Sequence, residues 1–365
     1  MKTKPFAPAR RVWILAASSV VGQKEKQGPL GKAFDLSGED RFGKDTWEKA
    51  EAEMQRLALS VALQKAGKEA DGIDLLFAGD LVNQCLSSSF GLMDYRIPYL
   101  GLFGACSTCA EGMLLAAMAA SSVCDRCVSV TSSHYCTAER QFRYPLEYGG
   151  QRTPTSQWTV TGAGGFVYSS LLRDVQDNAE TFIPEITEIL PGCIVDHGIS
   201  DANNMGAAMA PAAADTLERY FASGHSPEEF DRIFTGDLSR EGSAILLDLL
   251  SVKGYDLTGV HEDCGNLIYD PKKSDTHAGA SGCGCSAVVM AADILKRVKR
   301  GEYKNILFLG TGALMNTLSV NQGQTIPGIA HLIHIQAANA EELKGKSETE
   351  PELGSEEGEE HGYSA

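Results

Sequence analysis

A segment of the first half of the chain returns in the second half. Residues 74–81 read DLLFAGDL, and residues 231–238 read DRIFTGDL. After each copy comes a run of small residues that suits the opening of a helix, at 104–107 and again at 282–286. Such self-similarity is the sequence signature of a duplicated structural unit. The chain is therefore predicted to build two related halves.

Strand-like and helix-like segments alternate through both halves. Such alternation predicts mixed sheets covered by helices, an α/β fold. Two halves of this kind would pack as five layers, α-β-α-β-α, with an N-terminal half at 11–175 and a C-terminal half at 180–337. The helices are predicted at 47–66, 86–94, 106–120, 209–222, 241–250 and 284–299. The strands are predicted at 11–17, 74–80, 99–104, 127–133, 164–170, 185–196, 231–237, 267–269, 304–311 and 326–335.

The negative charge of the chain is concentrated at its C-terminal end. Of the formal net charge of −16, residues 341–365 contribute nine Glu against two Lys. This stretch offers little to bury, which predicts a disordered acidic tail. The remaining body is acidic and carries no basic stripe, so nucleic acid is excluded as an expected partner.

The ten cysteines are too scattered for a disulfide framework and suit a reducing compartment. A zinc site could be drawn from two Cys-x-x-Cys pairs, one at 106–109 and one at 124–127. We expect no metal, because the first pair opens a helix and the second lies in a turn before a strand. We expect Cys85, Cys136, Cys193 and Cys264 to be small buried residues that pack inside the protein.

Residues 10–20 combine two arginines with a short apolar run, as a signal peptide does. Trp13 and its β-branched neighbours suit a first strand equally well, and we favour the strand. No other segment approaches the ~20 apolar residues of a membrane span. We therefore expect a protein that is not secreted and that meets any membrane only peripherally.

Cys106 lies where the strand pattern at 99–104 turns into a helix pattern. Free backbone N–H groups and the positive end of the helix dipole favour a thiolate or a bound anion at such a position. We predict the functional site here.

Several longer stretches of the sequence resemble the motifs of a known protein family. They are VGQKEKQGPLG at 21–31, AGDLVNQ at 78–84, FGACST at 103–108, TSSH at 131–134, AERQFRYP at 138–145, EYGGQ at 147–151, MAPAAAD at 209–215, DCG at 263–265, ASGCGCSA at 280–287 and IPGIAH at 326–331. With these strings and its duplicated layout, the chain resembles the thiolase and β-ketoacyl synthase superfamily. From about residue 11 to 335 it is identified as a member of the stage V sporulation protein AD (SpoVAD) family, a thiolase-fold family of endospore formers.

The resemblance implies a protein that binds dipicolinic acid (pyridine-2,6-dicarboxylate) and serves its uptake into the developing spore. It also implies membrane-embedded partners from the same operon, a homodimer, and a peripheral place on the cytoplasmic side of the forespore membrane. No cofactor is implied. Calcium remains open, because the bound form could be free dipicolinate or its calcium chelate.

Six residues are candidates for the ligand site. Cys106 and His134 are the stronger ones, because we expect both at the ends of adjacent strands. Asp80 could hold calcium, orient His134 or fix a loop. The arginines could pair with carboxylates or belong to a surface or dimer-interface loop. The full set is Cys106, His134, Asp80, Arg140, Arg143 and Cys283.

The competing hypothesis is an acyltransferase that uses Cys106 as its nucleophile. Such chemistry needs a base and oxyanion donors. In thiolases and synthases the base and the donors come from second-half strings such as Gly-His-Pro, and we do not find such strings here. His277 could act as the base instead, but a histidine in a loop is usually just solvated. Cys283 sits where a family catalytic side chain could project, but it also opens a helix and could simply be a packing residue. A ligand-free scaffold at the spore membrane is the third possibility.

Overall fold

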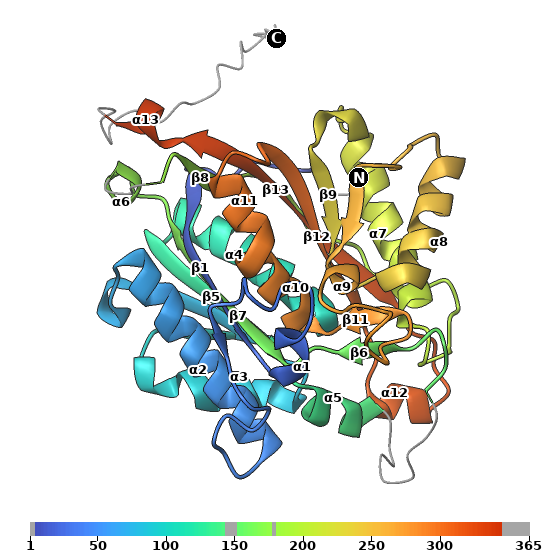
Figure 1. Cartoon of the computed structure of the whole chain (residues 1–365). Helices are drawn as coiled ribbons and strands as arrows, with labels where there is room; N and C mark the ends of the chain where they lie inside the picture. Colours follow the sequence, from blue (N-terminus) through green and yellow to red (C-terminus); the bar gives the residue numbers. More distant parts are fainter. Residues whose placement is uncertain (1–3, 143–151, 177–179, 345–365) are drawn as a thin grey trace, which may run out of the picture.

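The computed structural model describes residues 4–142, 152–176 and 180–344. Their strands form one eleven-stranded sheet and one two-stranded sheet (Figure 1). The first half of the chain supplies β1 (Val12–Val21), β2 (Leu36–Ser37), β3 (Leu75–Gly79), β4 (Tyr99–Leu102), β5 (Arg126–Ser133) and β7 (Gly162–Ser169). The second half supplies β8 (Phe182–Leu190), β9 (Arg232–Thr235), β10 (His261–Asp263), β12 (Asn305–Ala313) and β13 (Gly328–Asn339).

The large sheet has the same strand order in its two halves. Outward from the middle, the first half runs β1-β7-β5-β3-β4 and the second runs β8-β13-β12-β9-β10. In each half the first two pairings are antiparallel and the last two are parallel. The halves join where Val12 and Trp13 of β1 pair with β8. The predicted duplication is therefore present in the strand topology.

Helices cover both faces and fill the space between the halves (Figure 1). The three largest hydrophobic cores of the described residues lie between these helices and the sheet, and the predicted α/β fold class is confirmed. The outer helices are α2 (Trp47–Ala66) and α3 (Leu86–Leu92) on the first half, with α7 (Met205–Phe221) and α8 (Ser239–Val252) on the second. The central helices are α4 (Thr108–Ser122), α10 (Cys283–Val289) and α11 (Leu295–Lys299), the last two joined by a π-helical stretch, Met290–Ile294.

The composition of α4 explains its central position. The helix is built mainly from Ala, Gly, Ser, Cys and Met, and most of these residues are buried whichever way they point. A helix that is apolar all round belongs inside a protein. Its small side chains allow close contact, because a Cβ added at Gly310 of β12 would lie 2.5 Å from Cβ of Ala110.

Two predicted segments differ in kind from the structure, and the strand predicted at 185–196 ends early, because β8 stops at Leu190. The strand predicted at 267–269 is wrong, because residues 264–267 form α9 (Cys264–Leu267), which begins where Asp263 accepts a hydrogen bond from the backbone N–H of Gly265. The tail predicted from residue 341 begins with α13 (Ala340–Leu343), whose Leu343 is only 2% exposed. Gln176 donates to the carbonyl of Leu343. Residues 345–365 lie outside the described residues.

Within the described residues, no helix is both long and apolar enough to cross a bilayer. The segment at 10–20 that resembles a signal peptide is β1, buried in the middle of the sheet. The strand prediction for that segment is therefore confirmed.

Candidate functional site

Cys106 sits in a sharp turn between β4 and α4. The turn is a short 3₁₀ segment, Ala105–Ser107, which runs directly into α4. Ala105 has φ of +53°, in the left-handed region that is unfavourable for a residue with a Cβ. This backbone presents the Cys106 side chain to a cavity that residues of both halves line.

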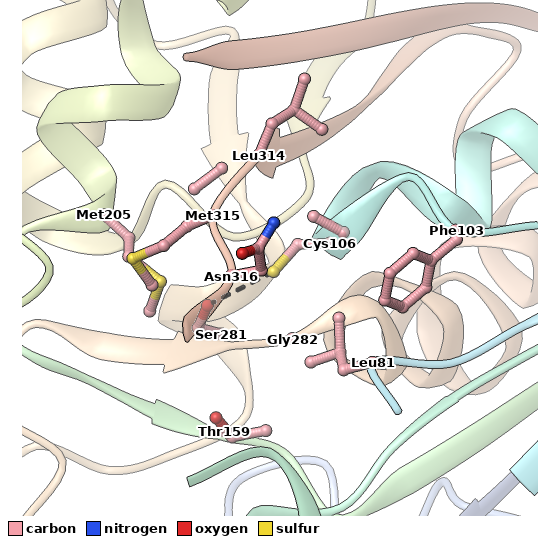
Figure 2. Close-up of a pocket in the computed structure, with 12 residues that line it drawn as sticks. Leu81, Phe103, Cys106, Thr159, Met205, Ser281, Gly282, Leu314, Met315 and Asn316 are labelled. Carbon is pink, nitrogen blue, oxygen red and sulfur yellow. Dashed lines mark hydrogen bonds between the residues drawn. The ribbon is translucent and has the colours of Figure 1, made fainter. Parts of the chain in front are cut away.

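The cavity has a volume of about 190 Å³ and a predominantly apolar wall (Figure 2). No charged residue is among the described residues that line it. Phe103, Met205 and Met315 give the wall its apolar character, while Ser281 and Asn316 add polar groups. The full lining is Leu81, Phe103, Ala105, Cys106, Thr159, Met205, Ser281, Gly282, Ala313, Leu314, Met315 and Asn316.

A buried carboxylate, Asp237, lies directly behind this wall. Its Oδ2 accepts hydrogen bonds from Oγ of Ser281 at 2.7 Å and from the N–H of Gly282 at 3.0 Å. Its Oδ1 accepts from Oγ1 of Thr311 at 2.8 Å. The Sγ of Cys106 is 3.8 Å from Oγ of Ser281 (Figure 2). Cys106 of the first half thus faces an acidic group of the second half.

This environment keeps the Cys106 thiol protonated. Burial and the nearby Asp237 carboxylate raise the pKa of Cys106 well above its usual range. Burial also raises the pKa of Asp237, although its hydrogen bonds oppose that shift. The helix terminus was expected to favour a thiolate or a bound anion at this position. Burial and the like charge of Asp237 oppose the thiolate, and the bound anion stays a prediction.

Asp237 was not among the candidate residues, yet the sequence contained a signal for it. The repeated string places Asp237 at the position that Asp80 holds in the first half. Only Asp80 was proposed for the site. The carboxylate that reaches Cys106 is instead the copy from the opposite half.

His134 lies away from the cavity wall. Its Nε2 is 2.8 Å from the carbonyl oxygen of Asp40, and its Nδ1 accepts from the N–H of Cys136. Burial lowers the pKa of His134, so the ring is neutral. The predicted adjacency to Cys106 is wrong: His134 follows β5 and Cys106 follows β4, and β3 lies between these strands.

Asp80 is used inside the first half. Its side chain accepts from the N–H groups of Val82 and Ser88, each at 2.8 Å. This matches the loop-fixing role, one of the three roles considered for Asp80. His134 makes its hydrogen bonds elsewhere, so the structure does not show Asp80 orienting it.

A chain of buried polar groups joins Asp80 to Glu51. Nε2 of Gln55 donates to the hydroxyls of both Ser88 and Ser132, and Ser132 donates in turn to Glu51. Burial and the charge of Asp80 raise the pKa of Glu51 to about 8. Glu51 is therefore mainly protonated at neutral pH, which lets the two acidic groups share a dry interior.

Cys283 is packed behind the cavity and does not line it. Its Sγ donates to the carbonyl of Ser132 at 2.9 Å, and burial with the nearby Cys106 raises its pKa. Arg140 belongs to α5 (Tyr135–Phe142), and Arg143 lies outside the described residues. Their proposed ligand roles stay predictions.

His277 is not part of the cavity wall either. It lies in the turn before β11 (Gly279–Ser281), with Nε2 at 3.1 Å from Oδ1 of the exposed Asp275. All ten cysteines are free. In the described ranges, no group of three or more His, Cys, Asp and Glu side chains is arranged to hold a metal ion.

Comparison with known structures defines the class of protein first. The chain is similar to cerulenin-bound OleA of Xanthomonas campestris, at a TM-score of 0.56 and 15% identity, covering 90% of this chain and 99% of that one. It is likewise similar to human mitochondrial 3-ketoacyl-CoA thiolase in complex with CoA, at a TM-score of 0.57 and 12% identity, covering 91% and 99%. The fold is that of the thiolases.

The family is narrower than the fold. Residues 3–336 match the family "Stage V sporulation protein AD (SpoVAD)". Over 330 residues the chain is 42% identical to stage V sporulation protein AD of Bacillus subtilis (strain 168), covering 90% of this chain and 95% of that protein. The chain belongs to the SpoVAD family of sporulation proteins.

Proposed function

We propose that this SpoVAD family member binds dipicolinate and serves its uptake into the developing spore, without acyl-transfer chemistry of its own. The observation that carries the second part is the Asp237 carboxylate behind Cys106, joined to it through Ser281. A nucleophilic cysteine needs a base or a cation that stabilises its thiolate. Cys106 instead faces a group that opposes thiolate formation.

The ligand preference follows from family membership and from the ligand's chemistry. Dipicolinate is a planar dianion near neutral pH, so its site needs cations or N–H donors. The bound form is either the free acid or its calcium chelate. Membrane-embedded proteins of the same operon would then hold this chain at the spore membrane, since its acidic body is repelled by anionic lipid.

Saturating dipicolinate should stabilise the purified chain against heat. At a ligand concentration near 100 times Kd, the stabilisation is about 2.7 kcal/mol. For a chain of this size that raises the melting temperature by roughly 4 °C. Differential scanning calorimetry with dipicolinate, with and without calcium, measures the shift. Benzoate, which lacks the second carboxylate, is the control, and an unchanged melting curve at saturating dipicolinate contradicts the proposal.

Cys106 should stay unmodified by acyl-coenzyme A. Incubation with acetyl- and acetoacetyl-coenzyme A is expected to leave the intact mass of the protein unchanged, because the thiol is held protonated. Iodoacetamide applied to the unfolded protein confirms that the thiol is chemically intact. A stable thioester that disappears in Cys106→Ser would revive the acyltransferase hypothesis.

The same proposal includes a homodimer formed along β4. β4 ends the large sheet in the described part of the chain, and its Leu100 is 51% exposed. Phe90, Met93 and Phe103 close by in the sequence are 54–66% exposed as well. An apolar edge strand pairs readily with another strand. A second copy related by a two-fold axis offers the same edge in return.

Leu100→Lys should convert such a dimer into monomers, because a charge on each copy would be buried against its mate. Sedimentation velocity of the full chain measures the change. Val252→Lys, on an 87% exposed side chain at the end of α8, is the matched control and should leave the association state unchanged. A parent protein that sediments as a monomer at all concentrations removes the dimer from the proposal.

A further inference from the structure

We propose that dipicolinate enters the cavity beside Cys106 together with one proton, which Asp237 takes up. This inference rests on the proposed function and names the residue that makes binding depend on pH. The ligand is a dianion near neutral pH, and the described lining of the cavity carries no charged side chain that could pair with it. The carboxylate of Asp237 lies directly behind this lining, where its charge repels a bound anion.

The Oδ2 atom of Asp237 is the atom that can accept the proton. Its two hydrogen bonds come from Oγ of Ser281 at 2.7 Å and from the N–H of Gly282 at 3.0 Å. A hydroxyl group is both a donor and an acceptor, so its hydrogen bond can be reversed, whereas a backbone N–H can only donate. A proton on Oδ2 would be donated to Oγ of Ser281, and the N–H of Gly282 would keep its acceptor.

The other carboxylate oxygen of Asp237 is less suited to the proton. Oγ1 of Thr311 donates to Oδ1 at 2.8 Å and accepts from the N–H of Asp237 itself at 3.1 Å. Thr311 is fully buried and is not part of the described cavity lining. A reversed Thr311 hydroxyl could not donate to a ligand in the cavity, and a buried donor without an acceptor is costly.

Ser281 can pass the effect of the proton to the ligand. Its side chain lines the cavity, and its Oγ lies 3.8 Å from Sγ of Cys106 (Figure 2). In the structure the Ser281 hydroxyl is used on Asp237. When Asp237 donates instead, the O–H of Ser281 becomes free to donate to a ligand carboxylate. One proton from the solvent thus removes a like charge and supplies a hydrogen-bond donor to the cavity.

Asn316 offers N–H donors in the same cavity. Its Oδ1 accepts from the N–H of Ser319 at 2.9 Å, so the amide nitrogen is the end of the side chain that can donate to a ligand. Figure 2 shows the Asn316 side chain beside Cys106. Neutral donors from Ser281 and Asn316 can bind a carboxylate once the charge behind the wall is gone.

No cation among the described residues hydrogen-bonds to Asp237, so protonation is the available way to remove its charge. Burial already raises the pKa of Asp237, which is the direction that proton uptake requires. Asp263 of β10 is a second acid within electrostatic reach of Asp237, and His261 of the same strand is neutral, because burial lowers its pKa to about 4. Further titratable groups around Asp237 are the protonated thiols of Cys106 in the turn before α4, Cys264 in α9 and Cys285 in α10.

Isothermal titration calorimetry of the full chain with dipicolinate, from about pH 6 to about pH 8, tests the proposal. Because the bound state holds one more proton than the free state, the parent should bind about tenfold more tightly for each unit by which the pH falls. Titrations in two buffers with different ionisation enthalpies count the protons. We expect about one proton to be taken up for each ligand bound.

Three variants assign the proton to its residue. Asp237→Asn should abolish both the proton uptake and the pH dependence. Ser281→Ala keeps the carboxylate but removes the hydroxyl, so binding near pH 6 should weaken about tenfold. Glu25→Gln is the matched control, because Glu25 is a buried carboxyl group with a pKa of about 7 that is not part of the described cavity lining. It should bind and take up protons as the parent does.

The outcomes separate the proton from the function. Equal affinity at every pH without proton uptake would overturn the inference and leave the proposed function standing. Absence of binding by the parent at every pH would remove both. Proton uptake that persists in Asp237→Asn would show that another group takes the proton. Should Asp237→Asn fail to fold, Ser281→Ala decides, because an unchanged affinity near pH 6 would contradict the hydroxyl reversal.

Discussion

Asp237→Ala is expected to lower the free energy of unfolding by about 3–5 kcal/mol, because several buried donors lose their acceptor at once. The orphaned groups are the hydroxyls of Ser281 and Thr311 and the N–H of Gly282. Urea unfolding of the purified variant measures the loss. Few single substitutions in this chain should do more damage.

Two further variants show whether burial is the cause. Asp256→Ala removes another aspartate that accepts from a backbone N–H, here that of Thr258, but Asp256 is exposed, and stability should change by less than about 1 kcal/mol. Asp237→Asn keeps the size and removes the charge, so the pKa of Cys106 should fall and iodoacetamide should alkylate it faster. Equal losses for both alanine variants would contradict the explanation.

Stability should be greatest in weakly acidic solution and should fall as the pH rises towards 8. Burial raises the pKa of Glu51 to about 8 and those of Glu25 and Asp263 to about 7. A carboxyl group whose pKa is raised by folding contributes stability below its unfolded pKa, and this is lost as the pH rises through the folded value. Since one pKa unit corresponds to about 1.4 kcal/mol, the loss should be on the order of 3 kcal/mol for each of these groups.

At low pH, buried histidines are expected to limit the stability of the fold. Burial lowers the pKa values of His261 and His331 to about 4, so the stability they contribute is present above their unfolded pKa and is lost as the pH falls through 4. Thermal unfolding between pH 4 and 8.5 should therefore give a maximum near pH 5.

A substitution isolates the alkaline part of this profile. Glu51→Gln imitates the protonated side chain, so its stability relative to the parent should improve steadily from pH 5 to pH 8. Glu69→Gln, on an exposed side chain beyond the end of the same helix, should show no such trend. Parallel pH profiles for the parent and Glu51→Gln would refute the assignment to Glu51.

Much of the fold was predictable because local sequence and tertiary structure agree. The helix predicted at 47–66 has those bounds in the structure, since Thr46 caps its start and Gly67 takes the left-handed conformation at its end. The strand at 261–263 was missed because His-Glu-Asp shows no apolar pattern. It forms only because β9 offers a parallel edge.

The candidate site was harder to predict because it is assembled across long sequence separations. Cys106 could be found from a local strand-to-helix transition. Asp237 reaches it only because β12 of the second half packs against the turn before α4 and pairs with β9, which no local pattern reveals. The prediction that His134 lies next to Cys106 failed for the same reason. The order of the strands in the sheet differs from their order along the chain.

Each half of the chain places an aspartate near a cysteine of the other half, and this arrangement has a consequence for the origin of the protein. Cys106 of the first half faces Asp237 of the second, and Cys283 of the second half lies within the electrostatic influence of Asp80 of the first. A single half could not supply both members of either pair. An ancestor of half the length would have met this requirement only as two identical chains around a two-fold axis. Gene fusion would then have freed the two copies to diverge, leaving one cysteine on a cavity and the other sealed in the interior.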